Sequence, residues 1–233
     1  MRRIILTVTG GLLFSMSSAQ TNADLKTIAE RLAEFGAIVQ HRLEPKFNAA
    51  GIAYPPARLA LIGLKREGVV ELYAANDGRL PRFVRSYRIL AASGGVGPKL
   101  RLGDRQVPEG IYRLRELNPN SRFHLSLWVD YPNAFDRDRA AAEGRKELGG
   151  QIMIHGGRVS KGCLAVGDTA AEDLFVLAAL AGIENVTVIL APFDFREHSL
   201  GELPPNAPSW TSVLYEEIGR AMNRYPLPLR RAP

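Results

Sequence analysis

Apolar residues recur along the chain with two periods, one typical of helices and one typical of strands. From residue 25 to residue 43 they fall every three or four positions, while charged residues occupy the other face, which predicts an amphipathic helix. We expect Asn22 or Asp24 to cap the start of this helix, because such side chains accept hydrogen bonds from free helix amides. Pro45 is expected to end or kink it, since proline lacks an amide hydrogen and clashes with the preceding turn.

Shorter runs that alternate between apolar and polar residues predict strands after this helix. Residues 58–65 and 69–73 flank the turn sequence Arg-Glu-Gly and predict a hairpin. In residues 122–129 the alternation is strict, as expected for a strand with one buried face. Further strands are expected at 83–90, 111–114, 151–155 and 185–193, and further helices at 169–182 and 209–225. Many strands with a few helices predict an α+β fold.

A glycine-rich segment interrupts this pattern between residues 91 and 114. It carries five glycines and two prolines, too many for the interior of a helix. Such a composition is typical of an ordered loop, which here leads into the strand expected at 111–114. The proline-rich end of the chain, residues 226–233, is expected to be extended.

The first 19 residues have the composition of a secretory signal peptide. Two arginines precede an apolar stretch from Ile4 to Phe14, and Ser17 and Ala19 then occupy the positions that a signal peptidase reads. The apolar stretch is too short for a membrane span, and a retained membrane anchor is the alternative. We therefore expect an exported protein.

The charge balance is mildly basic. The chain has 30 lysines and arginines against 24 acidic residues, a net charge of +6, and loss of the first 19 residues would lower this charge to +4. The basic residues are scattered and form no stripe with interleaved aromatic side chains, so we expect no nucleic-acid partner. A mild positive charge suits an anionic polymer such as a cell wall, but this signal is weak.

Cys163 is the only cysteine, so it cannot form a disulfide within the chain. In an exported protein such a thiol is buried and inert, links two chains, or reacts. It lies between two glycine-rich turns, eight residues after His155. A thiol attacks carbonyl carbon as the thiolate, and an imidazole or the amides of a sharp turn raise the thiolate fraction. The spacing favours a nucleophilic cysteine with a histidine base, while an inert buried thiol is the alternative.

Glycines around this pair leave room for a substrate. Gly156 and Gly157 allow the chain to turn tightly, and Gly162 removes bulk beside the thiol. The backbone amides of Gly162 and Cys163 are placed to form an oxyanion hole. We expect no metal, because one cysteine and one nearby histidine supply two ligands where structural zinc takes four. A serine hydrolase is disfavoured, since no Gly-x-Ser-x-Gly elbow is present.

Three stretches together resemble the catalytic domain of the L,D-transpeptidases, a family of bacterial cell-wall enzymes. Residues 154–168, IHGGRVSKGCLAVGD, resemble the family signature, in which His-Gly precedes Ser-x-Gly-Cys. Residues 97–114, GPKLRLGDRQVPEGIYRL, look like its upstream Gly-Asp and Pro-Glu-Gly-x-Tyr element. Residues 123–140, FHLSLWVDYPNAFDRDRA, are similar to a Tyr-Pro-Asn-x-x-Asp segment of one short-motif branch. The resemblance covers about residues 58–195.

The resemblance implies a β-rich mixed sandwich with an N-terminal helix and flanking helices. In it Cys163 would be the nucleophile and His155 its base, while Ser160 and Gly162 would shape the turn. Gly156 would let the strand end pass close to the substrate. The candidate substrate-binding residues are Arg158, Lys161, His124 and Gly156. The two basic residues could bind substrate carboxylates, and a structural role is the alternative for the histidine.

The signal-peptide composition and the resemblance together divide the chain into four segments. These are a signal peptide (1–19), an N-terminal helical segment (20–57), the catalytic domain (58–195), and a C-terminal helix with a proline-rich tail (196–233). Some positions depart from the family pattern. Lys161 stands where many members have a second histidine, and Leu164 and Ala165 stand where many have arginine or asparagine. These departures affect the choice of acceptor rather than the Cys-His pair.

The implied activity is cysteine-dependent acyl transfer on peptidoglycan stem peptides at diaminopimelate, without a cofactor. Cys163 would attack the diaminopimelate carbonyl, and an amine of a second stem peptide would then accept the acyl group. In the hydrolase alternative water accepts it, and the short-motif branch includes an enzyme that detaches an outer-membrane lipoprotein from peptidoglycan. The expected partners are therefore stem peptides and, for that branch, a lipoprotein. Two competing hypotheses are a non-catalytic wall-binding module and a thiol redox protein.

Overall fold

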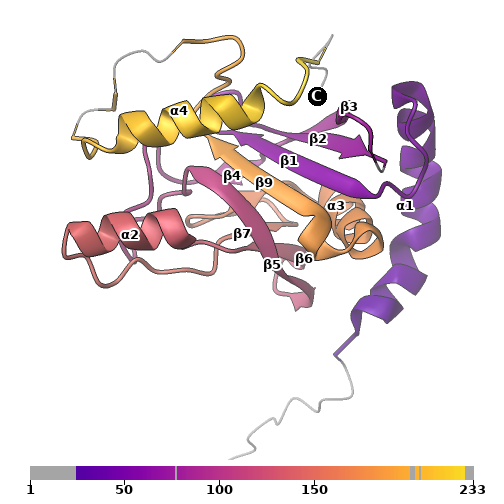
Figure 1. The fold of residues 1–233 in the computed structure, drawn as a ribbon. Coiled ribbons are helices and arrows are strands. Elements are labelled where there is room, and N and C mark those ends of the chain that lie inside the picture. The colour runs from indigo at the N-terminus through magenta and orange to yellow at the C-terminus, as the bar shows by residue number, and fades with distance from the viewer. Residues whose placement is uncertain (1–24, 77, 200–202, 205, 229–233) are drawn as a thin grey trace, which may run out of the picture.

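One long sheet is the framework of the molecule, and helices surround it (Figure 1). The computed structural model describes residues 25–76, 78–199, 203–204 and 206–228. Its strands are β1 (Arg58–Leu64), β2 (Val69–Ala75), β3 (Arg82–Arg88), β4 (Ala91–Ala92), β5 (Gly110–Ser121), β6 (His124–Val129), β7 (Met153–His155), β8 (Leu164–Ala165) and β9 (Val186–Ala191). Its helices are α1 (Ile28–Ala50), α2 (Ala134–Ala142), α3 (Asp168–Ala181), α4 (Thr211–Met222) and the short 3-10 helix η2 (Ile183–Asn185).

The sheet is mixed. Over the described residues its order is β3-β2-β1-β9-β5-β6-β7-β8-β4. β1 runs parallel to β9 and β7 parallel to β8, whereas the other neighbours are antiparallel. The start of β5 pairs with β9 and its later part with β6, so this strand joins the two halves of a bent half-barrel. The α+β class and the mixed β-rich sheet expected from the sequence are confirmed.

Strand β1 shows why both faces of the sheet are covered. Leu59 and Leu61 face the core under α1 and α3, while Ala60 and Ile62 face the core under α4. Successive side chains of a strand point to opposite faces, so a continuous apolar run buries both. α1 and α4 thus supply side chains to the same cores as the central region, and neither forms a separate folding unit.

Helix α1 differs from the prediction at its end. It runs through Pro45 to Ala50 and ends at Gly51, whose φ of +68° lies in the left-handed region that glycine tolerates. Pro45 does not stop the helix because Leu43 and Phe47, on either side of it, are fully buried in the core. Packing of these side chains offsets the lost hydrogen bond.

The start of α1 is fixed by a capping box. The Thr27 side chain accepts a hydrogen bond from the Glu30 amide, and the Glu30 side chain accepts one from the Thr27 amide. The predicted caps Asn22 and Asp24 and the predicted signal peptide lie outside the described residues. In the described part of the chain, no helix is both long enough and apolar enough to cross a membrane.

The predicted hairpin, the remaining strands and the helices at 169–182 and 209–225 are confirmed within a few residues. The short elements β4, β8 and η2 were missed, as were two larger features. β5 extends to Ser121, well beyond the predicted 111–114, because its later part pairs with β6. Helix α2 was not predicted, although Asn133 caps it with a box completed by Asp136.

Candidate active site

The register of β7 and β8 brings Cys163 and His155 to the same face of the sheet. These strands are parallel, and His155 pairs with Ala165. Cys163 directly precedes β8, and together with Met153 and His155 of β7 it lines one side of the sheet. The loop between the two strands therefore returns the thiol to the neighbourhood of the imidazole.

Both side chains line one pocket. Its volume is about 620 Å³. The pocket is lined by Asn118, Asn120, Ser121, Arg122, Phe123, Gln151, Met153, His155, Val159, Ser160, Lys161 and Cys163. A pocket of this size, in which a few polar groups converge, is typical of a ligand or active site.

His155 is held in one tautomer. Its Nδ1 lies 2.6 Å from the carbonyl oxygen of Gly156, and a carbonyl oxygen only accepts hydrogen bonds. Nδ1 therefore carries the hydrogen, which leaves the Nε2 lone pair of the neutral ring free to take a proton. The ring of Phe123 stacks on the imidazole with centroids 4.6 Å apart. Burial of the ring lowers the pKa of His155, although its hydrogen bond to Gly156 opposes this shift.

Cys163 rests as a neutral thiol. Its side chain is half-buried, and its Sγ donates to the carbonyl oxygen of Gln151 at 3.5 Å. Burial raises the pKa of Cys163, and a backbone hydrogen bond from Met153 and the charge of Lys99 offset part of this rise. The raised pKa of the thiol and the lowered pKa of His155 favour a pair that is neutral at rest over a thiolate–imidazolium pair.

Ser160 and Gly162 hold the turn that carries the thiol. Ser160 Oγ accepts from the Cys163 amide at 3.0 Å and donates to the Cys163 carbonyl oxygen at 2.6 Å. The Gly162 amide donates to Ser93 Oγ at 2.6 Å, and the φ of Gly162 is +93°, which favours glycine. Both amides assigned to the oxyanion hole are thus engaged by hydroxyl groups, so this hole is not preformed as the sequence suggested.

Gly156 lies at a close approach between three segments. A Cβ at this position would lie 2.5 Å from Asp168 Oδ1 and 2.6 Å from the carbonyl oxygen of Phe123. Gly156 is buried and does not line the pocket. The strand end therefore passes close to the backbone of Phe123 and the side chain of Asp168, which leaves no room for a side chain at this position.

The structure separates the other candidate substrate-binding residues. Lys161 is exposed and lines the pocket with Cys163. Arg158 is also exposed but lines a neighbouring cavity of about 440 Å³, together with Arg85 and the start of α3. Only Lys161 is therefore placed to meet a ligand beside the thiol.

His124 faces helix α3 instead of the pocket. Its Nε2 lies 3.1 Å from Glu172 Oε1, and its ring packs edge-on against Phe35 of α1 at 5.3 Å. Its φ of +70° lies in the left-handed region, at the turn between β5 and β6. The structure thus gives His124 the structural role that was the alternative in the sequence.

Several pocket residues were missed from the sequence. The end of β5 and the turn after it contribute Asn118, Asn120, Ser121, Arg122 and Phe123 to the rim. The polar run from 118 to 122 after an apolar strand was a signal for an exposed edge, but not for its position beside Cys163. In the described chain, no three His, Cys, Asp or Glu side chains are grouped so that they could hold a metal ion.

The sequence is similar to those of known L,D-transpeptidases. The profile of the YkuD L,D-transpeptidase catalytic domain matches residues 65–188, more than half of the chain. The Escherichia coli K12 protein named "Putative L,D-transpeptidase YafK" is 38% identical over 141 residues, which cover 58% of this chain and 54% of that protein. The chain thus spans about half the length of this relative.

Two solved structures align more distantly. The helical cell shape determining protein Pgp2 of Campylobacter jejuni has a TM-score of 0.46 and 20% identity, over 68% of this chain and 52% of that chain. Bd1075 of Bdellovibrio bacteriovorus has a TM-score of 0.43 and 18% identity, over 74% and 56%. The family follows from the profile match, which includes both Cys163 and His155: the chain belongs to the L,D-transpeptidase catalytic-domain family.

Proposed function

We propose that this protein is a cysteine acyltransferase that acts on peptidoglycan stem peptides at diaminopimelate. The observation that carries the proposal is the shared pocket of Cys163 and His155, in which the imidazole is fixed with Nε2 free. Family membership supports the choice of a cell-wall substrate. Export to the periplasm or the cell envelope is part of the proposal, because stem peptides lie outside the cytoplasm.

The first half of the reaction forms a thioester. Cys163 Sγ attacks the diaminopimelate carbonyl carbon while its proton passes to His155 Nε2. The tetrahedral intermediate then collapses, the bond to the next residue breaks, and the imidazolium returns its proton to the leaving amine. Proton transfer during attack fits a pair that is neutral at rest, because the pKa of the thiol is raised and that of the imidazole lowered.

The oxyanion of this intermediate needs donors that are not free at rest. The Cys163 amide is bound to Ser160 Oγ and the Gly162 amide to Ser93 Oγ. In the proposed mechanism the substrate displaces one of these hydroxyl groups and accepts the released amide hydrogen bond. Substrate binding then releases the amide that stabilises the oxyanion, and both events take place in the turn that carries Cys163.

The second half of the reaction releases the acyl group. An amine of another stem peptide gives its proton to His155 Nε2 and attacks the thioester, which restores the thiol and forms a cross-link. Water in place of the amine gives a carboxylic acid instead. The polar rim formed by Asn118, Asn120 and Ser121 is accessible to either acceptor. Cleavage of a peptidoglycan–lipoprotein bond is the hydrolytic version of the same chemistry.

A thiol redox function is less well supported. Redox-sensing cysteines react as exposed thiolates with a lowered pKa. Burial raises the pKa of Cys163, and its side chain is only half-exposed. In the described chain it also has no second cysteine that could resolve an oxidised sulfur.

The proposal is tested with purified peptidoglycan fragments and mass spectrometry. The wild-type chain should convert tetrapeptide fragments, and Cys163→Ala should abolish conversion without loss of folding. Lys146→Met, a change at an exposed lysine outside the pocket, is the control and should retain conversion. Cross-linked dimers identify the transferase and shortened peptides the hydrolase. Conversion by Cys163→Ala would remove the proposal.

A carbapenem provides an independent probe of the nucleophile, since many family members are acylated by this class of β-lactam. The intact mass of the wild-type chain should rise by the mass of one carbapenem. The adduct should map to Cys163 and should be absent from Cys163→Ala.

A further inference from the structure

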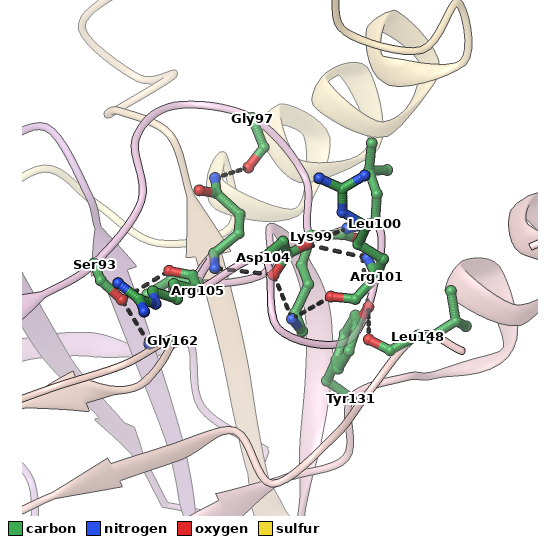
Figure 2. Close-up of polar contacts among 12 residues, drawn as sticks. Ser93, Gly97, Lys99, Leu100, Arg101, Asp104, Arg105, Tyr131, Leu148 and Gly162 are labelled. Carbon is green, nitrogen blue, oxygen red and sulfur yellow. Dashed lines mark hydrogen bonds and ion pairs between the residues drawn. The ribbon is translucent and has the colours of Figure 1, made fainter. Parts of the chain in front are cut away.

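The glycine-rich segment from residue 93 to residue 106 folds around one buried ion pair (Figure 2). Lys99 Nζ lies 2.5 Å from Asp104 Oδ1 and also donates to the carbonyl oxygen of Arg101 at 2.9 Å. The two side chains are 5% and 15% exposed. Buried charges of this kind are tolerated only when they are paired and hydrogen-bonded.

The carboxylate of Asp104 closes the loop. Its two oxygens accept, besides the lysine, the backbone amides of Leu100, Arg101 and Gln106, each at 3.0 Å. Burial alone would raise the pKa of Asp104, but the hydrogen bonds from Lys99 and these amides outweigh it, and the pKa is lowered. The carboxylate therefore stays charged and the ion pair intact at neutral pH.

Further contacts make this loop rigid. The side chain of Gln106 donates to the carbonyl oxygens of Gly95 and Gly97 at 2.7 and 2.5 Å. On the other side, the ring of Tyr131 lies 5.9 Å from Lys99 Nζ, and its hydroxyl donates to the Leu148 carbonyl oxygen at 3.2 Å. The loop is thus held from within and from the segment after β6.

Ser93 connects this loop to the turn that carries the thiol. Its Oγ accepts from the Gly162 amide at 2.6 Å and donates to the Arg105 carbonyl oxygen at 2.7 Å (Figure 2). Arg105 has a φ of +56°, a strained value for a residue with a side chain, which persists only where the surroundings hold it. Asp104 is its chain neighbour. Hydrogen bonds and one peptide link thus run from the ion pair to the residue before Cys163.

We propose that Lys99 is a positioning residue for the nucleophile. With Asp104 it holds the loop that fixes Gly162, the residue before Cys163, and its positive charge favours the negative charge that develops on the sulfur during attack. The inference deepens the proposed function and rests on it, because it concerns the cysteine that we propose as the nucleophile. Lys99 touches neither the substrate nor the reacting atoms in this scheme.

The other charged groups around Cys163 are less suited to this task. Arg122 and Lys161 line the pocket but are exposed, so water and salt screen their charges. The ring of His155 has a lowered pKa and is neutral. The charge of Lys99 lowers the pKa of Cys163 against the effect of burial, and Asp104 offsets part of that charge. The effect of removing the lysine is therefore expected to be moderate.

Alkylation of Cys163 by iodoacetamide measures this effect directly, because the chain has one cysteine and only the thiolate reacts. We expect Lys99→Met to move the midpoint of the pH–rate profile upward and to slow alkylation at pH 7.5 about threefold, as a shift of half a pH unit requires. Lys99→Arg should restore most of the rate. Lys146→Met, at an exposed lysine, should leave the profile unchanged.

A second variant covers the case in which Lys99→Met fails to fold because Asp104 is left unpaired. Lys99→Met/Asp104→Asn removes both charges and should shift the midpoint upward by less than Lys99→Met alone, because the opposing charge of Asp104 is also lost. If this double variant folds and the midpoint of its pH–rate profile equals that of the wild type, the inference is wrong. The alkylation assay needs no wall peptide. If the midpoint shifts as expected but the wild-type chain converts no wall peptide, the proposed function is wrong and the role of Lys99 still stands.

Discussion

At the scale of single residues, the imidazole of His155 is set for proton transfer by its two neighbours. The Gly156 carbonyl fixes the hydrogen on Nδ1, and the Phe123 ring shields the imidazole from water. Water stabilises the charged form, so shielding lowers the pKa of His155 below its ordinary value of 6.5. The proposed base therefore stays neutral to a lower pH than an exposed imidazole would.

Phe123→Ala tests this role of shielding. In the wild type the acid limb of kcat/KM on wall peptides should lie below pH 6.5, because His155 must be neutral to accept the proton. Removing the ring exposes the imidazole and raises the pKa of His155, so the acid limb should move toward pH 6.5. Phe123→Leu, which keeps an apolar cover, should shift it less. An acid limb that is the same in all three proteins would contradict the argument.

The sequence identified some of these residues and not others, for a physical reason. Cys163 and His155 lie within one short motif, so their spacing alone brings them near each other. Phe123, Ser93 and Lys99 approach from distant segments, and only the sheet order and the loop fold place them there. A motif cannot show which distant side chain covers a ring or accepts from an amide.

At the scale of elements, the end of β7 is constrained by how closely three segments meet. The Gly156 position lies against the Phe123 backbone and the Asp168 side chain at the start of α3. Any side chain there would push apart the elements that orient His155.

Gly156→Ala should therefore destabilise the fold by about 2 kcal/mol, since a Cβ would lie 2.6 Å from a carbonyl oxygen. The matched control is Gly36→Ala in α1, where nothing lies within 4 Å of the added Cβ. That change should stabilise the protein by about 0.8 kcal/mol, because alanine favours a helix interior. Urea unfolding measures both. A stable Gly156→Ala would mean that the backbone relaxes at this junction.

The ends of α1 and β5 differ from the prediction because tertiary contacts outweigh the local sequence preference there. Pro45 signalled the end of α1, but burial of Phe47 carries the helix on to Ala50. The short predicted strand at 111–114 became the long β5 because its continuation finds a partner in β6. In both cases tertiary contacts supplied the stabilisation that propensity could not reveal.

At the scale of the whole molecule, the helix α4 completes the second core. Its residues Leu214, Tyr215 and Ile218 pack against β1 and β9, outside the segment that matches the family. The predicted boundary at residue 195 therefore separates regions of sequence but not units of folding.

Ile218→Ala tests this contribution. The side chain is fully buried, so its loss should destabilise the fold by about 3 kcal/mol. Val213→Ala, in the same helix at a side chain that is 41% exposed, should change stability by less than about 0.5 kcal/mol. Thermal and urea unfolding give the comparison. Equal effects of the two changes would show that α4 adds little to the core.

Strand β5 belongs to both halves of the sheet and ends at the rim of the pocket that holds the sulfur. It begins directly after the loop built on Lys99 and Asp104. One continuous strand thus connects the edge that lines the pocket to the other half of the sheet. The edge that forms the pocket cannot be moved to another protein as a short segment, because strands outside the pocket fix its alignment.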